Sequence, residues 1–245
     1  MSDLLHHDPL HQFEIHTLFP LNIKGIDVSF TNASLFMVIT VLVTTFFLWG
    51  GISRAKLTPG RWQSMTEMIY GFVSNILDET MGTKGRKYFP FIFTIFMFIL
   101  VGNVIGMIPY TFTFTSQLIV TFGLAMIAFG MATLVGFMRH GLHYFTLFVP
   151  KGAPVYMLPL IVPIEILSYL SRPVSLSVRL FANMMAGHTM LKVFAAFTVA
   201  LGLFGVAPLF VNTLLTAFEI LVAVLQAYVF TILSCIYFQD AIHLH

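Results

Sequence analysis

SRPVSLSVRLFANMMAGHTMLKVF, residues 171–194, is the stretch from which the fold can be worked out. It is long and apolar, yet it contains Arg172, Arg179, His188 and Lys192. A charged side chain inside hydrocarbon costs about 2.5 kcal/mol or more, so a cation in such a run predicts a functional site. Arg179 is the strongest case, because it has no acid within one helical turn and its guanidinium stays protonated. We therefore expect its partner to be a carboxylate on another subunit.

The composition indicates an integral membrane protein. Of the 245 residues, 58% are hydrophobic and 9% are charged, and the mean hydropathy is +0.92. Soluble domains carry about 25% charged residues. Several apolar runs reach the roughly 20 residues that cross a bilayer as a helix. We predict an all-α integral membrane protein, one membrane domain over residues 1–245, with about five membrane helices and one interfacial amphipathic helix.

Other functional classes find little support in the chain. The net charge of +2 gives no reason to expect nucleic acid as a partner. The stretch GTKGRK, residues 82–87, lacks the spacing of a nucleotide-binding loop. The single cysteine, Cys235, cannot form an internal disulfide. No cofactor is predicted.

Residues 1–30 form a polar segment that we expect outside the membrane. The segment lacks the basic region and apolar core of a typical signal peptide. His7 and His11 are spaced i, i+4 and would share one face of a helix, but no third ligand is placed beside them. A solvated tail is the favoured interpretation, so no metal site is predicted.

Three membrane helices of ordinary length are expected at about 34–49, 89–108 and 117–138. The second contains Gly102 and Gly106, a GxxxG pair that permits close helix contact. The polar connection PYTFTFTS, residues 109–116, is short, so the second and third helices are expected to form a hairpin.

Residues 61–80 show apolar positions at helical spacing with polar residues between them. This pattern is typical of an amphipathic helix. We favour a position on the membrane surface. Packing against a partner subunit is the alternative.

Two apolar runs, about 154–201 and 204–238, are too long for ordinary membrane helices. At 1.5 Å per residue each is on the order of 50 Å or more, whereas the hydrocarbon core is about 30 Å thick. Pro163 and Pro173 mark possible kinks in the first run. We predict two long, strongly tilted helices packed antiparallel within residues 154–240.

The positions of Lys and Arg predict the orientation. With five crossings, one side receives Arg54, Lys56, Arg61, Lys84, Arg86, Lys87, Arg139 and Lys151, whereas the other has only Lys24. The N-terminus is therefore expected outside and the C-terminus inside.

The first long helix carries polar residues on two faces. Arg172, Ser175, Arg179 and Asn183 form one i, i+3, i+4 stripe, while His188 points about 180° away from Arg179. Glu165 lies about 21 Å from Arg179 along the axis, which is too far for a direct ion pair.

The second long helix carries Asn212, Glu219 and Gln226 on one face, seven residues apart. Such groups line a water-filled slot or relay protons, or they form interhelical hydrogen bonds. Both interpretations stay open for Asn212 and Gln226. For Glu219 we favour a functional role, because an unpaired buried carboxylate is costly. Pairing with His188 would make it a proton acceptor pair.

RPVSLSVRLFANMMAGH at 172–188, LLTAFEILVAVLQAYVF at 214–230 and GNVIGMIP at 102–109 together resemble subunit a of F-type ATP synthases. The resemblance covers most of the chain. It implies the same tilted antiparallel helix pair, facing a rotating ring of c subunits. It also implies proton translocation that couples a proton gradient to ATP synthesis, with no ATP site in this chain.

The resemblance implies a role for each polar residue. Arg179 corresponds to the essential rotor-facing arginine, which also blocks a proton short circuit. The entry half-channel would contain Glu219, His188, Asn183 and Gln226, and we place Asn103 with them. The exit half-channel would contain Glu165 and Ser175. The implied partners are the c ring, peripheral stalk b-type subunits, the remaining synthase subunits, membrane lipid and the transported proton.

The absence of an obvious transit peptide favours a bacterial inner membrane over a mitochondrial one, with a periplasmic N-terminus and a cytoplasmic C-terminus. A stand-alone ion transporter is the competing interpretation. It would require an acid beside Arg179 within the same chain. An intramembrane hydrolase is disfavoured, because Ser175 has no histidine within helical reach.

Overall fold

The computed structural model describes residues 13–20, 22–23, 26–27, 29–53, 55–108, 111–149 and 155–242. His7 and His11 lie outside the described residues, and so do Lys24, Arg54, Pro109 and Lys151. The first part of the predicted polar segment is therefore not described.

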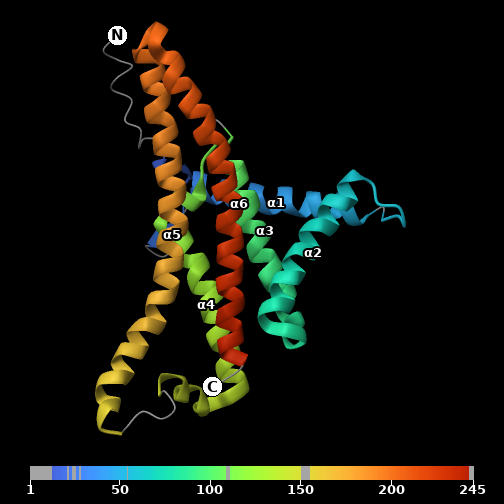
Figure 1. Ribbon diagram of the computed structural model, residues 1–245, viewed down its shortest axis with the longest axis vertical. Helices are drawn as coiled ribbons and strands as arrows, with labels where there is room; N and C mark the ends of the chain where they lie inside the picture. The colour runs from blue at the N-terminus through green and yellow to red at the C-terminus, as the bar shows by residue number, and fades with distance from the viewer. Residues whose placement is uncertain are drawn as a thin grey trace.

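Long helices dominate the architecture (Figure 1). They are α1 (Asn32–Ile52), α2 (Arg61–Met81), α3 (Phe89–Gly106), α4 (Leu118–His140), α5 (Leu158–Ala200) and α6 (Val206–Ile242). Short 3-10 turns lie between them, at η2 (Gly82–Tyr88), η3 (Phe114–Ser116), η4 (Gly141–Phe148), η5 (Val155–Met157) and η6 (Gly202–Gly205). Within the described ranges, five stretches are long and apolar enough to cross a membrane, with α2, η2 and α3 counted as one. The predicted all-α membrane fold is confirmed.

Among the described residues, strands occur only in the segment before α1. β1 (Thr17–Phe19) pairs antiparallel with β4 (Phe30–Thr31), and β2 (Asn22–Ile23) pairs antiparallel with β3 (Ile26–Asp27). Thr31 then caps α1, because its side chain accepts a hydrogen bond from the backbone N–H of Ser34. The chain thus enters its first helix from two small antiparallel strand pairs, with β2–β3 nested between β1 and β4.

α6 lies at the centre of the bundle, with α2, α3, α4 and α5 packed around it. Its C-terminal half supplies Phe230 and Phe238, both fully buried, to the main apolar core. Its first half is mostly exposed on the described surface, with Phe210 and Phe218 each more than 60% exposed. A large apolar surface of this kind is stable in lipid or against another apolar protein.

α5 and α6 run antiparallel along the longest axis of the molecule, and α1 lies across their direction (Figure 1). With 43 and 37 residues, they measure about 64 and 55 Å at 1.5 Å per residue. Both exceed a hydrocarbon core of about 30 Å, as the sequence predicts, and their strong tilt in the membrane stays a prediction. Pro163 and Pro173 lie inside α5, which continues through both positions as one helix.

Glycine makes the turn between these two helices possible. Gly202 has φ 54°, a left-handed conformation that favours glycine. At Gly205, an added Cβ would lie 2.2 Å from the backbone oxygen of Thr198. The two helices therefore reverse direction within a few residues.

The GxxxG pair permits close packing, but what packs against it is a loop and not another membrane helix. An added Cβ on Gly102 would meet the ring of Phe114, and one on Gly106 would meet the side chain of Thr113. Both neighbours belong to the connection before α4 and not to a second helix. The glycines thus hold a loop against α3.

The second and third membrane helices, α3 and α4, are joined by a short connection as predicted, but they pack only weakly on each other. Both α3 and α4 pack closely on α6, and in the described part of the chain they make few contacts with each other. The connection is short, as expected, but α6 supplies the apolar surface that each helix buries.

α2 is amphipathic, as predicted, and its buried face packs on α1, α3 and α6. Val73 and Leu77 are almost fully buried there, whereas Trp62 and Met68 are exposed. Its position at the membrane surface stays a prediction.

Candidate functional site

Glu219 and His188 meet where α5 and α6 pack together. The Nδ1 atom of His188 lies 3.6 Å from Oε1 of Glu219, and both side chains are largely buried. The other ring nitrogen, Nε2, lies 3.0 Å from the hydroxyl of Thr113, in the connection between α3 and α4. The structure thus brings together the acid and the histidine that the sequence places on separate helices.

Within the described ranges, the buried carboxylate of Glu219 lacks the hydrogen bonds that such a group usually makes. Its side chain is 4% exposed, and neither oxygen has a hydrogen-bond partner among the described residues. A buried ionised carboxylate without hydrogen bonds is strongly destabilised. The position therefore suits a carboxyl that accepts and releases a proton with the histidine beside it.

Gly187 makes room for this carboxylate. A Cβ added at position 187 would lie 2.6 Å from Oε1 of Glu219 and 3.1 Å from Cδ. Every other residue carries that carbon, so only glycine allows the acid to lie so close to α5. Gly187 was not identified from the sequence. The feature that could have indicated it is a glycine in the interior of a predicted helix.

Gly187→Ala is expected to displace the Glu219 carboxylate from His188 and to slow the proton transfer that the sequence resemblance implies by about tenfold or more, because a misplacement of about 1 Å has effects of this size in enzymes. The measurement is the rate of proton uptake by membrane vesicles. Gly71→Ala is the matched control, because an added Cβ meets nothing within 4 Å there. Equal rates for the two variants would contradict the spacing argument.

A second polar contact links the same helices about two turns from the first. The side-chain amide of Asn183 donates a hydrogen bond to Oε1 of Gln226 at 3.0 Å. Asn103, on α3, donates to the backbone oxygen of Ala223 at 3.4 Å and is fully buried. Oδ1 of Asn103 and Nε2 of Gln226 have no partner within the described ranges, so both can bind water.

The five residues of the predicted entry route therefore lie around α6. Asn212 lies on the same face of α6 as Glu219 and Gln226, but its Oδ1 atom has no hydrogen-bond partner among the described residues. Thr113 was missed by sequence analysis, because a hydroxyl in a loop gives no periodic signal.

Arg179 lies in a separate groove between α5 and α6. The groove has a volume of about 330 Å³. It is lined by Ser168, Ser171, Arg172, Ser175, Leu176, Arg179, Leu233, Ile236, Tyr237 and Asp240. Arg179 is exposed, and it makes no hydrogen bond or ion pair with any described residue. It is therefore available to an anion from outside the chain.

Arg172, seven residues earlier on the same stripe, is neutralised within the chain. Its Nη1 atom lies 2.7 Å from Oδ2 of Asp240, and its guanidinium lies 5.6 Å from the ring centre of Tyr169 and 6.0 Å from that of Tyr237. Arg172 thus has a structural pair, which contrasts with Arg179. Asp240 was not identified from the sequence, because its partner lies 68 residues away.

Tyr169 is held in place by a chain of hydroxyl groups. Its hydroxyl lies 2.7 Å from that of Tyr144 and 2.8 Å from that of Thr133. Tyr144, in η4, packs against Gly136 and is almost fully buried. Burial, and then the hydrogen bond with Tyr169, raises the pKa of Tyr144, so the hydroxyl stays neutral.

The structure does not bring Glu165 together with Ser175. Ser175 lines the Arg179 groove, whereas Glu165 lies outside it, ten residues or about 15 Å away along α5. Glu165 is half-buried and makes no ion pair with a described residue.

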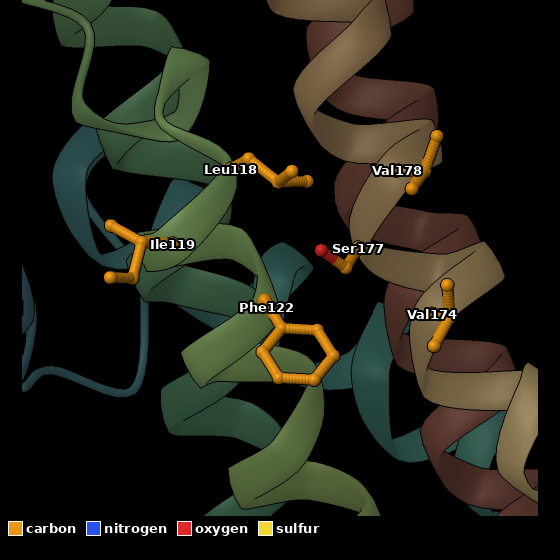
Figure 2. Close-up of a pocket in the computed structure, with 6 residues that line it drawn as sticks. All are labelled: Leu118, Ile119, Phe122, Val174, Ser177 and Val178. Atoms are coloured by element: carbon orange, nitrogen blue, oxygen red, sulfur yellow. The ribbon is translucent and has the colours of Figure 1, made fainter.

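A larger groove, between α4 and α5, is lined almost entirely by apolar side chains (Figure 2). It measures about 530 Å³ and is lined by Leu118, Ile119, Phe122, Val174, Ser177 and Val178. Ser177, its one polar residue, is fully buried and lies 3.2 Å from the hydroxyl of Thr121. The groove is an apolar surface without a titratable group.

Comparison with known proteins gives a consistent match. The family model described as ATP synthase A chain matches residues 34–239. A relative from Mesorhizobium japonicum named ATP synthase subunit a is 56% identical over 243 residues, covering 96% of each chain. Another of that name, from Rhodospirillum rubrum, is 53% identical over 240 residues and covers 98% of this chain and all of its own. One from Rhizobium leguminosarum is 53% identical, with 96% and 97% covered.

Proposed function

The chain belongs to the ATP synthase A chain family, and we propose that it forms the stationary half of a proton path whose moving half is a ring of c subunits. Members of this family translocate protons in the membrane sector of the synthase. The observation that carries the proposal is Arg179, which is exposed, lines a polar groove and makes no hydrogen bond or ion pair with a described residue. A permanent cation in this setting requires an external anion, and a ring carboxylate supplies one.

The proton enters through the polar residues around α6. Glu219 and His188 form the acceptor pair, and Asn183, Gln226 and Asn103 provide amide groups that hold water along the route. The two buried oxygens of Glu219 have no hydrogen-bond partner among the described residues. This supports the role, because they can take up a proton without breaking such a hydrogen bond.

Protonation lets the ring carboxylate move into lipid. A neutral acid is far less costly in hydrocarbon than an ion, so each c subunit turns away from the chain only after it has accepted a proton. At about 200 mV, one proton delivers roughly 4.6 kcal/mol. The ring carries this free energy to the soluble part of the synthase, where ATP is made.

The proton leaves through the groove that contains Arg179 and Ser175, with Glu165 further along α5. Arg179 favours the ionised form of the ring carboxylate and therefore promotes release. Its fixed charge also repels a proton that would cross directly between the two half-channels. This chain contributes no group to the ATP chemistry.

The remaining assignments follow from the same proposal. Residues 154–240 face the c ring, residues 61–80 lie at the membrane surface, and b-type stalk subunits complete the stationary part. The relatives are bacterial, and the chain spans a bacterial inner membrane with its N-terminus periplasmic and its C-terminus cytoplasmic.

Crosslinking tests which surface meets the ring. Ala182 and Ala186 are exposed and lie on the Arg179 side of α5. Each is replaced by cysteine in a Cys235→Ala background and labelled with benzophenone maleimide in membranes. We expect illumination to join at least half of the labelled chains to c subunits, detected by mass spectrometry.

Phe46→Cys is the matched control, because Phe46 is 64% exposed but lies on α1. A c-subunit crosslink from Phe46→Cys together with none from Ala182→Cys and Ala186→Cys would show that the ring lies elsewhere.

A further inference from the structure

The segment Phe13–Phe19, here called the strap, is fixed to the start of α1. The side-chain amide of Asn32 donates to the backbone oxygen of Glu14 at 3.1 Å, and its Oδ1 accepts from the backbone N–H of His16 at 3.3 Å. The backbone N–H of Asn32 donates to the oxygen of His16 at 3.1 Å. Three hydrogen bonds to one residue hold the middle of the strap in place.

The first described residue of the strap is held by a different part of the fold. The side-chain amide of Gln117, just before α4, donates to the backbone oxygen of Phe13 at 2.7 Å. This hydrogen bond joins residues 104 positions apart. Phe13 is therefore positioned by two elements that meet only in the folded chain.

The ring of Phe13 lies against His188. The ring centroids are 6.4 Å apart and the planes make an angle of 63°, an edge-on contact. Both nitrogens of His188 face other groups, since Nδ1 faces Glu219 and Nε2 faces Thr113. Phe13 therefore lies beside the carbon atoms of the imidazole. With the strap in place, the side chain of His188 is only 12% exposed.

We propose that Phe13 is a positioning residue for His188, held over the imidazole by Gln117 and Asn32. A flipped imidazole would turn a ring nitrogen away from its polar neighbour and towards the apolar ring of Phe13, which costs free energy. Phe13 therefore keeps the ring aligned between Thr113 and Glu219 and excludes water on its own side. This inference rests on the proposed relay role of His188 and Glu219.

The test combines proton pumping with the access of a reagent to a thiol beside His188. A role of Phe13 in general packing of the fold would not change this access specifically. Thr113→Cys in a Cys235→Ala background places a thiol beside His188, and its rate of alkylation by N-ethylmaleimide is measured in membranes. We expect Phe13→Ala to raise this rate about tenfold, because the variant removes the aromatic cover. Gln117→Leu should raise it about fivefold, the change expected from the loss of one hydrogen bond.

Phe19→Ala is the matched control, because Phe19 lies in the same strap, is 67% exposed and pairs with Phe30 in the register of β1 and β4. Without the cysteine reporter, Phe13→Ala should slow ATP-driven pumping by an assembled complex, and Phe13→Tyr should restore it. Equal alkylation rates for Phe13→Ala and Phe19→Ala, or unchanged pumping in Phe13→Ala, would overturn the inference. Normal pumping by Glu219→Gln would instead overturn the relay itself, and the alkylation comparison would still report on the strap.

Discussion

Arg179→Ala is expected to abolish ATP-driven proton pumping in a complex that still assembles. Arg179 is exposed and makes no ion pair with a described residue, so its loss leaves no internal partner behind. What is lost is the attraction for an ionised carboxylate, and removal of such a charge typically lowers a rate by about a hundredfold or more. Because the same charge repels protons, passive proton leak through the vesicles should rise.

Arg172→Ala provides the matched control for this experiment. Arg172 lines the same groove seven residues earlier, but it is paired with Asp240 within the chain. Its loss should reduce stability modestly, by about 1 kcal/mol for a partly exposed pair, and leave most of the pumping. Pumping and leak are measured on the same vesicles, with assembly checked by recovery of the intact complex. Retained pumping in Arg179→Ala would exclude the rotor contact and favour a transporter that acts without it.

Glu219→Gln is expected to slow proton-driven ATP synthesis about a hundredfold while the complex assembles normally. The amide has nearly the shape of the carboxyl group but cannot exchange a proton, and general acid–base groups typically contribute factors of this size. Assembly should be intact, because a neutral side chain is less costly to bury at a position that is 4% exposed. The measurement is the rate of ATP synthesis in energised vesicles.

Asn212→Ala serves as the control for Glu219→Gln. Asn212 lies two helical turns earlier on the same face of α6, and its Oδ1 atom makes no hydrogen bond with a described residue. Its replacement should change the synthesis rate less than about twofold. An unchanged rate in Glu219→Gln would remove the acid from the relay and leave His188 to act alone.

Much of the architecture was predictable because the bilayer leaves few alternatives. Backbone groups in hydrocarbon must be paired within a helix, so apolar runs of sufficient length become helices whatever their neighbours are. The extra length of α5 and α6 predicts their tilt in the same way. That Arg179 makes no ion pair with a described residue was also predictable, since no acid lies near it in the sequence.

Pairing between helices was predictable only where chemistry narrowed the choice. A buried acid and a histidine on neighbouring antiparallel helices are expected to meet, and Glu219 and His188 do. Small and loop residues give no such signal. Gly102 and Gly106 were expected to allow close packing, and they do so against Phe114 and Thr113. A GxxxG pair indicates close approach without indicating what approaches.

The amino-acid sequence by itself determined the helices, their order, the length of the tilted pair and the polar residues that hydrocarbon would otherwise exclude, because these depend on local composition and on the thickness of the bilayer. Only the tertiary structure decided that Asp240 neutralises Arg172, that Gly187 leaves space for Glu219 and that Phe13 and Thr113 flank His188. Each of these contacts joins residues distant in the chain, and its geometry depends on how the helices pack around α6.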